Sequence, residues 1–363
     1  MKKKILFFSH RAKHGGGERS FFELILELHH TQKIDGFIVL GEKGWLYDKF
    51  SDCGWTPLIL NFPSIKSFSF SSAFKILKII KTQKIEIIHC NTTRAMLYAA
   101  FVKIFVNIRI IWHQRGTDKR GLFEYILALF ADNIIAISNT VRQQLLDLKI
   151  NPKKIICVYN GIRIDNSEII EKQIPKNSDS KFYIALVGRF TIEKGHRYLI
   201  EIANILINRR KKENLKFVFC GAAEFGESQY SEIIELIKNY QLTDYFEFVG
   251  YIENIPKFLN EKIDITAITS QREAFGRVIL ESWLAKTPII AFAVEGPAEI
   301  IDNNKTGILI EKNNIEKFAD AIENLLNDNK LYQYLTACGA QKLQEFDLKN
   351  TAAKILEIYL NEK

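Results

Sequence analysis

The sequence lacks the features by which several classes of protein are recognised. Its five cysteines stand apart, with no C-x-x-C pair and no Cys/His spacing typical of a metal site. It has no D-x-D triplet, and no stretch approaches the ~18–20 apolar residues of a membrane-spanning helix. The apolar run near the N-terminus is too short for a signal peptide. We therefore expect a cytoplasmic protein in a reducing compartment, with any membrane contact peripheral.

Length and composition indicate two globular domains. The chain has 363 residues, of which 47% are hydrophobic, enough for two domains with substantial cores. Residues 1–165 carry 25 Lys and Arg against 13 Asp and Glu (+12), and the remainder carries 25 against 29 (−4). A basic first half suits a membrane surface, a phosphate or a nucleic acid, but a lysine-rich composition gives the same charge without any partner.

Short apolar runs alternate with amphipathic segments along the first half. Strands that are apolar on both faces are typical of a parallel sheet covered by helices, and repeated β-α units predict a doubly wound fold. The expected strands are Lys4–Phe8, Phe37–Leu40, Leu58–Leu60, Ile85–His89, Arg109–His113, Ile134–Ile137 and Ile155–Val158; expected helices include Arg19–Leu28, Ser72–Thr82, Leu122–Ala131 and Thr140–Leu148.

The alternation restarts after a polar stretch. Residues 166–181 have the composition of a linker, which separates a first α/β domain at 1–165 from a second at 182–345. The expected strands of the second domain are Phe182–Val187, Phe217–Cys220, Phe246–Val249, Asp264–Thr269, Ile289–Val294 and Gly307–Ile310, and the helices Ile315–Leu326, Leu331–Phe346 and Lys349–Leu360 follow them.

A glycine-rich motif follows the first expected strand, where doubly wound sheets bind ligands. Residues 14–19 read H-G-G-G-E-R and open a helix, where glycines let the backbone approach a ligand and helix amides favour an anion. The dinucleotide fingerprint G-x-G-x-x-G is only partly matched, because Ser20 replaces the third glycine. The motif favours an anionic or polar ligand over NAD, and a plain flexible turn is the alternative.

Two further motifs follow strands of the second domain. The pattern G-R-F-x3-K-G contains Arg189 and Lys194, which can neutralise the charge of a departing diphosphate or can be solvated surface cations. The pattern E-A-F-G-x4-E runs from Glu273 to Glu281. Carboxylates are good acceptors for sugar hydroxyls, and amides at the start of the following helix suit a phosphate, although this spacing alone is common.

The order of these motifs resembles the retaining family-4 glycosyltransferases of GT-B fold. Similar pieces are V-Y-N-G-I at 158–162, F-V-G-Y at 248–251, and V-E-G-P-A-E at 294–299, where Glu295 replaces the first glycine of the family's G-G-x-x-E loop. The resemblance covers nearly the whole chain and is looser in the first domain. It implies two Rossmann-like domains facing a cleft, an acceptor bound by the first and a nucleotide-sugar donor by the second, with a helix at 346–363 returning to the first.

The resemblance also implies roles for particular residues. Arg189 and Lys194 would hold the donor diphosphate, Glu281 the ribose and Glu273 the transferred sugar. The other implied donor-binding residues are Gly16, Gly17, Gly188, Tyr251, Ile252, Phe275 and Gly276, and the candidate catalytic residues are His113, Glu273, Arg189 and Lys194.

Two histidines and two arginines are expected along one edge of the first sheet. His113 matches the position where the family places a histidine near the donor sugar, while His89 is equally well explained as a satisfied loop residue. Arg94 and Arg115 can meet an acceptor phosphate, so they and His89 are the candidate acceptor-binding residues.

No metal or cofactor is expected. The usual means of holding Mg²⁺ or Mn²⁺ on a donor diphosphate is missing, so Arg189, Lys194 and a helix dipole would take the place of the ion. The co-substrate implied by the resemblance is a nucleotide-diphosphate sugar, with UDP favoured over GDP.

One expected helix combines lysines with apolar residues. A basic amphipathic helix can rest on anionic lipid, but a surface helix whose apolar side belongs to the domain core gives the same pattern. The residues concerned are Lys75, Lys78 and Lys81, with Phe74, Leu77 and Ile80 beside them.

We therefore expect a retaining, metal-independent hexosyltransferase that acts on a glycan or lipid-linked acceptor in the assembly of cell-surface polysaccharide, lipopolysaccharide or another glycoconjugate. A nucleotide-sugar epimerase on the same scaffold would need further acid/base residues. A non-catalytic sugar-nucleotide-binding subunit would not need the charged motifs of the second domain. A nucleic-acid binder is least favoured, because no recognition motif is present.

Overall fold

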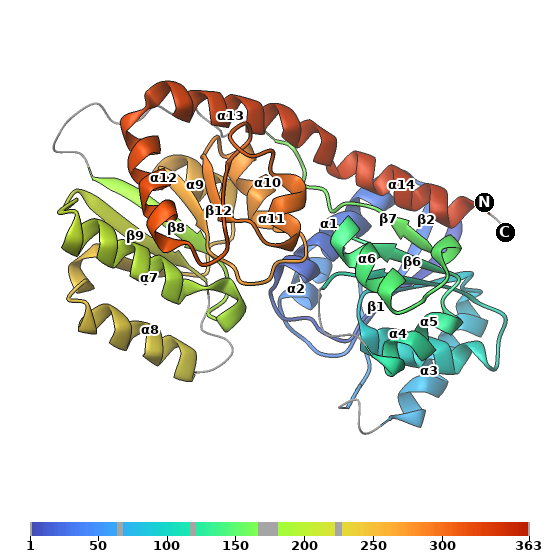
Figure 1. Ribbon diagram of the computed structural model, residues 1–363. Helices are drawn as coiled ribbons and strands as arrows, with labels where there is room; N and C mark the ends of the chain where they lie inside the picture. The colour runs from blue at the N-terminus through green and yellow to red at the C-terminus, as the bar shows by residue number, and fades with distance from the viewer. Residues whose placement is uncertain (1, 64–67, 117–120, 166–180, 222–226, 362–363) are drawn as a thin grey trace. The chain divides into compact units, whose positions relative to one another are not determined.

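The computed structural model describes residues 2–63, 68–116, 121–165, 181–221 and 227–361. It divides into two compact units, Met1–Arg163 with Phe346–Lys363, and Ile164–Glu345. The expected linker, 166–181, lies outside the described residues except for Lys181. Each unit is a parallel sheet with helices on both faces, so the expected class of two Rossmann-like domains is confirmed (Figure 1).

The first unit contains a seven-stranded parallel sheet in the order β3-β2-β1-β4-β5-β6-β7. The order reverses between β1 and β4, and ligands bind at such a switch point beyond the carboxyl ends of the strands. The strands are β1 Lys3–Ser9, β2 Ile34–Leu40, β3 Leu58–Ile59, β4 Ile87–Cys90, β5 Arg109–Gln114, β6 Asn133–Ala136 and β7 Ile155–Cys157.

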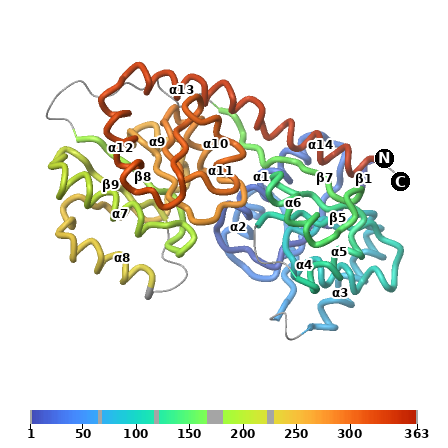
Figure 2. The backbone as a smooth tube through the Cα atoms, viewed as in Figure 1, coloured from blue at the N-terminus to red at the C-terminus, as the bar shows by residue number. Residues whose placement is uncertain are grey.

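Helices cover both faces of this sheet because neighbouring residues of β1 point to opposite sides. Phe7 belongs to the core formed with α1 and the C-terminal helix α14, whereas Phe8 packs against Tyr98 of α4. Figure 2 shows α14 and α4 on opposite sides of this sheet. α4 lies between α3 and α5. The helices are α1 Gly16–His30, α2 Trp45–Asp52, α3 Phe70–Gln83, α4 Thr93–Lys103, α5 Leu122–Phe130, α6 Asn139–Asp147 and α14 Leu348–Leu360.

The second unit contains a six-stranded parallel sheet in the order β10-β9-β8-β11-β12-β13, with its switch point between β8 and β11. Its strands are β8 Phe182–Val187, β9 Leu215–Cys220, β10 Phe246–Gly250, β11 Ile265–Ile268, β12 Ile289–Phe292 and β13 Ile308–Ile310; its helices are α7 His196–Asn204, α8 Glu227–Asn239, α9 Ile255–Lys262, α10 Arg277–Leu284, α11 Glu295–Ile300, α12 Ile315–Asn327 and α13 Asn329–Leu343.

Short polar side chains fix where several helices begin. The side chains of Ser69, Thr92 and Ser138 accept hydrogen bonds from backbone amides in the first turns of α3, α4 and α6. Such caps satisfy donors that a helix leaves without a partner. Because each cap comes shortly after a strand or loop, the helices start close to the edge of the sheet where the strands end.

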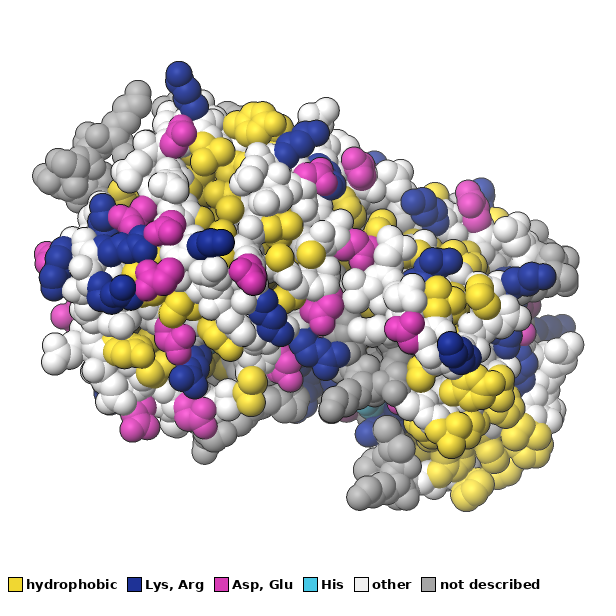
Figure 3. All heavy atoms as spheres, viewed as in Figure 1, with side chains coloured by type: hydrophobic (Ala, Val, Ile, Leu, Met, Phe, Trp, Pro, Cys, Tyr) yellow, Lys and Arg dark blue, Asp and Glu magenta, His cyan; other side chains and the backbone are white. Residues whose placement is uncertain are grey.

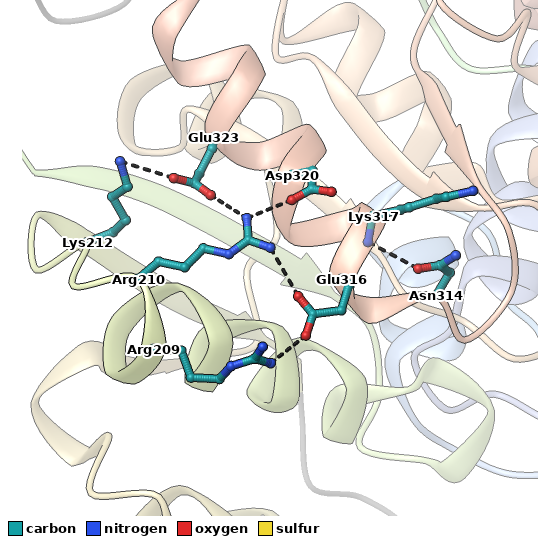
Figure 4. Close-up of polar contacts among 8 residues, drawn as sticks. All are labelled: Arg209, Arg210, Lys212, Asn314, Glu316, Lys317, Asp320 and Glu323. Carbon is teal, nitrogen blue, oxygen red and sulfur yellow. Dashed lines mark hydrogen bonds and ion pairs between the residues drawn. The ribbon is translucent and has the colours of Figure 1, made fainter.

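An ion-pair network holds a helix end in place in the second unit. Arg210 follows a π-helical turn, Ile205–Arg209, and its guanidinium contacts Glu316, Asp320 and Glu323 of α12, with a distance of 2.8 Å to Asp320 (Figure 4). The side chains of Glu316 and Asp320 are about half exposed. Each exposed ion pair contributes little to stability. The network holds α12 against the segment that carries Arg210.

Candidate functional site

Three glycines form the floor of the candidate site in the second unit. Gly188, Gly221 and Gly250 stand at the ends of β8, β9 and β10, linked by hydrogen bonds from Gly188 N–H to the Cys220 carbonyl and from Gly221 N–H to the Gly250 carbonyl, both 2.8 Å. A Cβ at position 221 would lie 2.0 Å from the Gly188 carbonyl oxygen. Sequence reasoning missed Gly221, although its position directly after a buried strand was a usable signal.

The loop after β8 is fastened to the end of β11, across the switch point. Gly195 has a φ of +70°, and a Cβ there would lie 2.0 Å from the Thr269 carbonyl oxygen. The Thr269 hydroxyl in turn donates to the Gly195 carbonyl at 2.9 Å. This docking places Lys194 beside the β11 loop, while Arg189, near the start of the same loop, is exposed.

Lys194 and Glu273 are brought together by these two loops. The Lys194 ammonium donates to Glu273 Oε2 at 2.5 Å, and the side chains are 26% and 17% exposed. The backbone of Glu273 is held as well, because its N–H donates to Glu295 Oε2 at 3.1 Å and its carbonyl accepts from Gly296 N–H at 2.8 Å. A cation and a carboxylate are thus held together at the switch point of the second sheet.

Backbone close contacts shape the start of α10. Gly276 caps the helix with a φ of +88°, a conformation that favours glycine. The side chain of Phe275 is buried, and a Cβ at Gly296 would lie 2.6 Å from the Phe275 carbonyl oxygen. Residues 294–299, expected as a loop like the family's G-G-x-x-E, are instead the N-cap and first turns of α11. Gly296 therefore packs closely on the Phe275 backbone, which brings the start of α11 next to the loop before α10.

Glu281 lies in the second turn of α10 and is 4% exposed. Its Oε1 accepts a hydrogen bond from Arg277 Nε at 3.0 Å, an i,i+4 pair that sequence reasoning did not assign. The pair gives the buried carboxylate a cationic partner, since an unpaired charge at that depth is costly. Tyr251 and Ile252 follow β10, and Tyr251 is 41% exposed.

In the first unit, two buried histidines form a hydrogen-bonded row. His89 in β4 and His113 in β5 are 0% and 2% exposed, and His89 Nε2 lies 3.1 Å from His113 Nδ1. The Tyr359 hydroxyl of α14 lies 2.6 Å from His89 Nδ1. Burial, followed by the positive charge of Arg115, lowers the pKa of His89 to about 3 and holds that of His113 well below its usual range. Both rings are therefore neutral.

The tautomers of this row follow from a neighbour that only donates. Arg115 Nη2 lies 3.3 Å from His113 Nδ1, and a guanidinium has no acceptor, so this nitrogen accepts. His89 Nε2 must then donate to it, and Tyr359 must donate to His89 Nδ1. His113 Nε2 consequently carries the hydrogen, and among the described residues this buried atom has no hydrogen-bond partner. The row therefore ends in a buried N–H donor.

This arrangement corrects the interpretation of His89. It lies inside a strand, and both of its ring nitrogens are taken, by Tyr359 and by His113. It therefore positions His113 and does not present a nitrogen to an acceptor. Tyr359 was missed because it comes from the last helix, far away in the sequence, and no local pattern marks it.

Arg115 and Arg94 lie in different surroundings. Arg115 donates to Asn91 and, at 3.0 Å, to Asn160 Oδ1, and a Cβ at Gly17 would lie 3.6 Å from its side chain. It therefore joins the loops after β4 and β7 to the start of α1, which begins at Gly16. Arg94 donates instead to the Phe62 carbonyl at 3.1 Å. Asn91 and Asn160 were not predicted, although Asn160 lies in one of the family-like motifs.

Neither a metal site nor a membrane-spanning helix is present among the residues that the structure describes. No group of three or more His, Cys, Asp or Glu side chains is arranged to hold a metal ion in the part of the chain that the structure describes. Nor does any helix there combine the length and the apolar character that crossing a bilayer requires.

Two parallel-sheet Rossmann-like domains, each with its polar residues at a switch point, define the GT-B class of architecture. Two family models match the chain in succession, Glycosyltransferase Family 4 over residues 14–166 and Glycosyl transferases group 1 over residues 166–342. The chain belongs to this glycosyltransferase family, which confirms the resemblance seen in its motifs.

The similar proteins are distant in sequence. The poly(ribitol-phosphate) α-N-acetylglucosaminyltransferase of Staphylococcus aureus is 26% identical over 85% of this chain, and the alignment spans 61% of that protein's length. The UDP-Gal:α-D-GlcNAc-diphosphoundecaprenol α-1,3-galactosyltransferase of Escherichia coli is 22% identical over 92% of this chain and 91% of that protein. The crystal structure of HepE from Anabaena with UDP and glucose superposes with a TM-score of 0.84 at 19% identity, covering 98% and 99% of the two chains.

Proposed function

We propose that this protein transfers a hexosyl unit from a nucleotide-diphosphate sugar to a glycan or lipid-linked acceptor, with retention at the anomeric carbon. The observation that carries the proposal is the Lys194–Glu273 pair, held at the switch point of the second unit beside the start of α10. Family membership supports the same class of reaction, and so do the acceptors that appear in the names of the two bacterial relatives.

The donor would bind at the strand ends of the second unit. Lys194 and the exposed Arg189 offer positive charge to the diphosphate, and the amides that open α10 add a partial positive charge. Glu273 would release Lys194 to the phosphate and accept hydroxyls of the transferred sugar. Glu281, orientated by Arg277, would take the ribose. UDP is the nucleotide favoured for this co-substrate.

Two cations and a helix end supply the charge stabilisation that a metal ion gives other transferases, so the proposed reaction is metal-independent. His113 would take part as a neutral donor, with its Nε2–H directed to a hydroxyl of a bound sugar. Because its pKa lies well below 6.5, its protonation state does not change near neutral pH.

The acceptor would bind the first unit, whose residues 1–165 are strongly basic. Arg115 and Arg94 are the proposed contacts to an acceptor phosphate. We place the protein on the cytoplasmic side of an anionic membrane, in peripheral contact with it, as a participant in the assembly of cell-surface polysaccharide or glycoconjugate.

The test begins with a thermal-shift screen of UDP-, GDP-, ADP- and CMP-sugars, because a ligand that binds only the folded state raises its melting temperature. The sugar that stabilises the protein is then offered with and without EDTA, and release of free nucleotide is followed by NMR. Slow donor hydrolysis that survives EDTA and yields the sugar with its original anomeric configuration is the expected result. Inversion, a full dependence on added Mg²⁺ or Mn²⁺, or an absence of any stabilising donor contradicts the proposal.

A further inference from the structure

An apolar surface lies on the outer side of the helices α3, α4 and α5 of the first unit. Figure 3 shows apolar side chains gathered in the lower right of the view, where Figure 1 places α4 and α5. Monomeric proteins rarely expose continuous apolar patches of this kind without a partner. The exposed side chains are Phe70 and Phe74 of α3, Ile104 and Phe105 after α4, and Leu122, Phe123, Ile126 and Leu129 of α5. We call this set the apolar face.

Helix α5 contributes most to the apolar face. Its nine residues read L-F-E-Y-I-L-A-L-F, and only Leu127 and Ala128 are buried. Leu122 is 73% exposed and Leu129 is 58% exposed. A surface helix normally turns polar residues to water, whereas this one is apolar on the outside as well. Burial in the domain core therefore does not explain its composition.

A groove of about 340 Å³ runs between these helices and is lined wholly by apolar residues, among them Phe101, Ile126 and Phe130. Aromatic rings form one of its walls, with Phe68 stacked on Tyr98 at 4.4 Å and Phe70 in contact with Phe101 at 5.7 Å between ring centroids. The described residues that line the groove offer no polar group to a peptide backbone or a sugar, so the groove suits hydrocarbon.

The charges beside the apolar face are mainly positive. Phe70, Phe74, Lys78 and Lys81 follow one another at intervals of four, four and three residues, which places the lysines on the same side of α3 as the exposed aromatic rings. Lys75, Lys78 and Lys81 are all exposed.

Two acidic side chains near the apolar face, Glu124 and Asp132, contact other groups of the protein. The Glu124 carboxylate accepts from the Gly121 N–H at the start of α5. Asp132 pairs with Lys103, which also donates to the Phe130 carbonyl at the end of α5. Hydrocarbon flanked by cations is the complement of an anionic bilayer, in which acyl chains lie beneath negative headgroups.

We propose that the apolar face is the membrane-docking surface of this protein, and that it inserts into the acyl boundary of an anionic bilayer while Lys78 and Lys81 contact the headgroups. The proposal rests on the proposed function only in that a lipid-linked acceptor would be met at this surface. It differs from adsorption by the lysines of α3 alone, because Ala73, Ile76 and Ile80 of that helix pack into the core and the inserting side chains come chiefly from α5.

Vesicle co-sedimentation of the full chain tests the proposal, using phosphatidylcholine with or without phosphatidylglycerol, at low and high salt. The triple variant Leu122→Gln, Ile126→Gln, Leu129→Gln removes exposed side chains and keeps good helix formers, so it should fold. It should reduce partitioning onto the anionic vesicles by more than about tenfold at both salt concentrations. Lys78→Gln with Lys81→Gln should reduce it by about tenfold at low salt and hardly at high salt.

The matched control is Leu58→Gln with Leu360→Gln, which removes two exposed leucines of the same unit, 42% and 40% exposed, outside the apolar face. It should bind vesicles as the wild type does. Equal binding by wild type and the triple variant, or no binding by the wild type, overturns the proposal. So does a wild-type dimer in light scattering that the triple variant converts to monomer, because the apolar face is then a protein interface.

Donor hydrolysis measured on the same variants separates this proposal from the proposed function. The triple variant should hydrolyse donor at the wild-type rate, since none of the altered residues has an assigned role in binding donor or acceptor. A wild type that binds vesicles but never turns over a nucleotide sugar refutes the function and leaves the docking surface standing.

Discussion

The two units use opposite physical means to hold their functional groups. In the first, buried neutral rings form a row in which each hydrogen bond fixes the next, and His113 Nε2–H is left at its end. In the second, basic and acidic side chains are paired: Lys194 with Glu273, which are partly exposed, and Arg277 with Glu281, which are buried. In the first unit, burial fixes the direction of an uncharged N–H donor. In the second, each basic or acidic side chain has a partner that a ligand can replace.

The largest expected effect comes from breaking the charged side of this contrast. Lys194→Ala should lower turnover by about 10²–10³, because one preorganised charge stabiliser is lost from a departing diphosphate. Steady-state rates with saturating donor measure this loss. Wild-type turnover in Lys194→Ala would remove that residue from the mechanism.

Glu273→Gln should weaken binding of the intact donor and spare the free nucleoside diphosphate, since Glu273 is assigned to the sugar. Calorimetric titration of the variant with both ligands measures the two affinities.

The next effect comes from breaking the neutral row at its far end. Tyr359→Phe leaves His89 Nδ1 as a buried acceptor without its donor, which should cost about 1–3 kcal/mol of stability. The His89 ring is then held by one hydrogen bond in place of two, so it positions the His113 ring less firmly, and turnover should fall by roughly tenfold without a change in donor affinity.

Nitrogen NMR of the histidine rings distinguishes this positioning role from plain destabilisation. The wild type and Tyr359→Phe should both show His113 protonated at Nε2, because Arg115 still donates to Nδ1, but the chemical shift of His89 Nδ1 should change in the variant as its hydrogen bond is lost. Leu356→Ala, a truncation in the same core and helix, is the control. It should lose stability and leave the shift of His89 Nδ1 unchanged.

Acid should affect the first unit more than the second. In the first unit, burial lowers the pKa of His10 and His89 to about 3 and that of His113 well below 6.5. In the second unit, burial lowers the pKa of His196 to about 3. An unfolded histidine binds a proton below pH 6.5 and these folded ones do not, so stability falls as the pH drops from about 6.5 toward 3.

Hydrogen exchange at neutral pH and near pH 5 resolves the two units in one experiment. Protection should decrease more in β4 and β5 than in β8 and β9. Equal losses in both sheets would mean that the buried histidines of the first unit do not control its acid stability.

The smallest effect is expected from the network on α12. Burial alone would raise the pKa of Glu323, but hydrogen bonds from Arg210 and Lys212 outweigh it and the pKa is lowered. Its stabilising contribution is present above pH 4.5 and is lost as the pH falls through the lowered value. Arg210→Gln should therefore lower Tm by no more than about 4 °C at pH 7, by scanning calorimetry, and by less below pH 4. A larger loss would show that the network carries the packing of α12.

Much of the fold could be predicted because strand and helix periods are local. Each expected strand is present within a few residues, and Phe182–Val187 agrees at both ends. Residues 294–299 were taken for a loop, because they resemble the family's G-G-x-x-E loop. In the structure Gly296 is required by the Phe275 backbone and Pro297 lies inside the first turn of α11.

The sequence by itself determined the two doubly wound sheets, because burial on both faces makes each strand a continuous apolar run, and it marked the loops that carry Arg189, Lys194 and Glu273 through glycines that only tight backbone approaches require. The tertiary structure alone decided that Lys194 meets Glu273, that Tyr359 holds the His89 ring beside His113, and that α5 turns its leucines to the surface. Contacts between residues far apart in the chain depend on how helices and strands pack, and no short pattern encodes them.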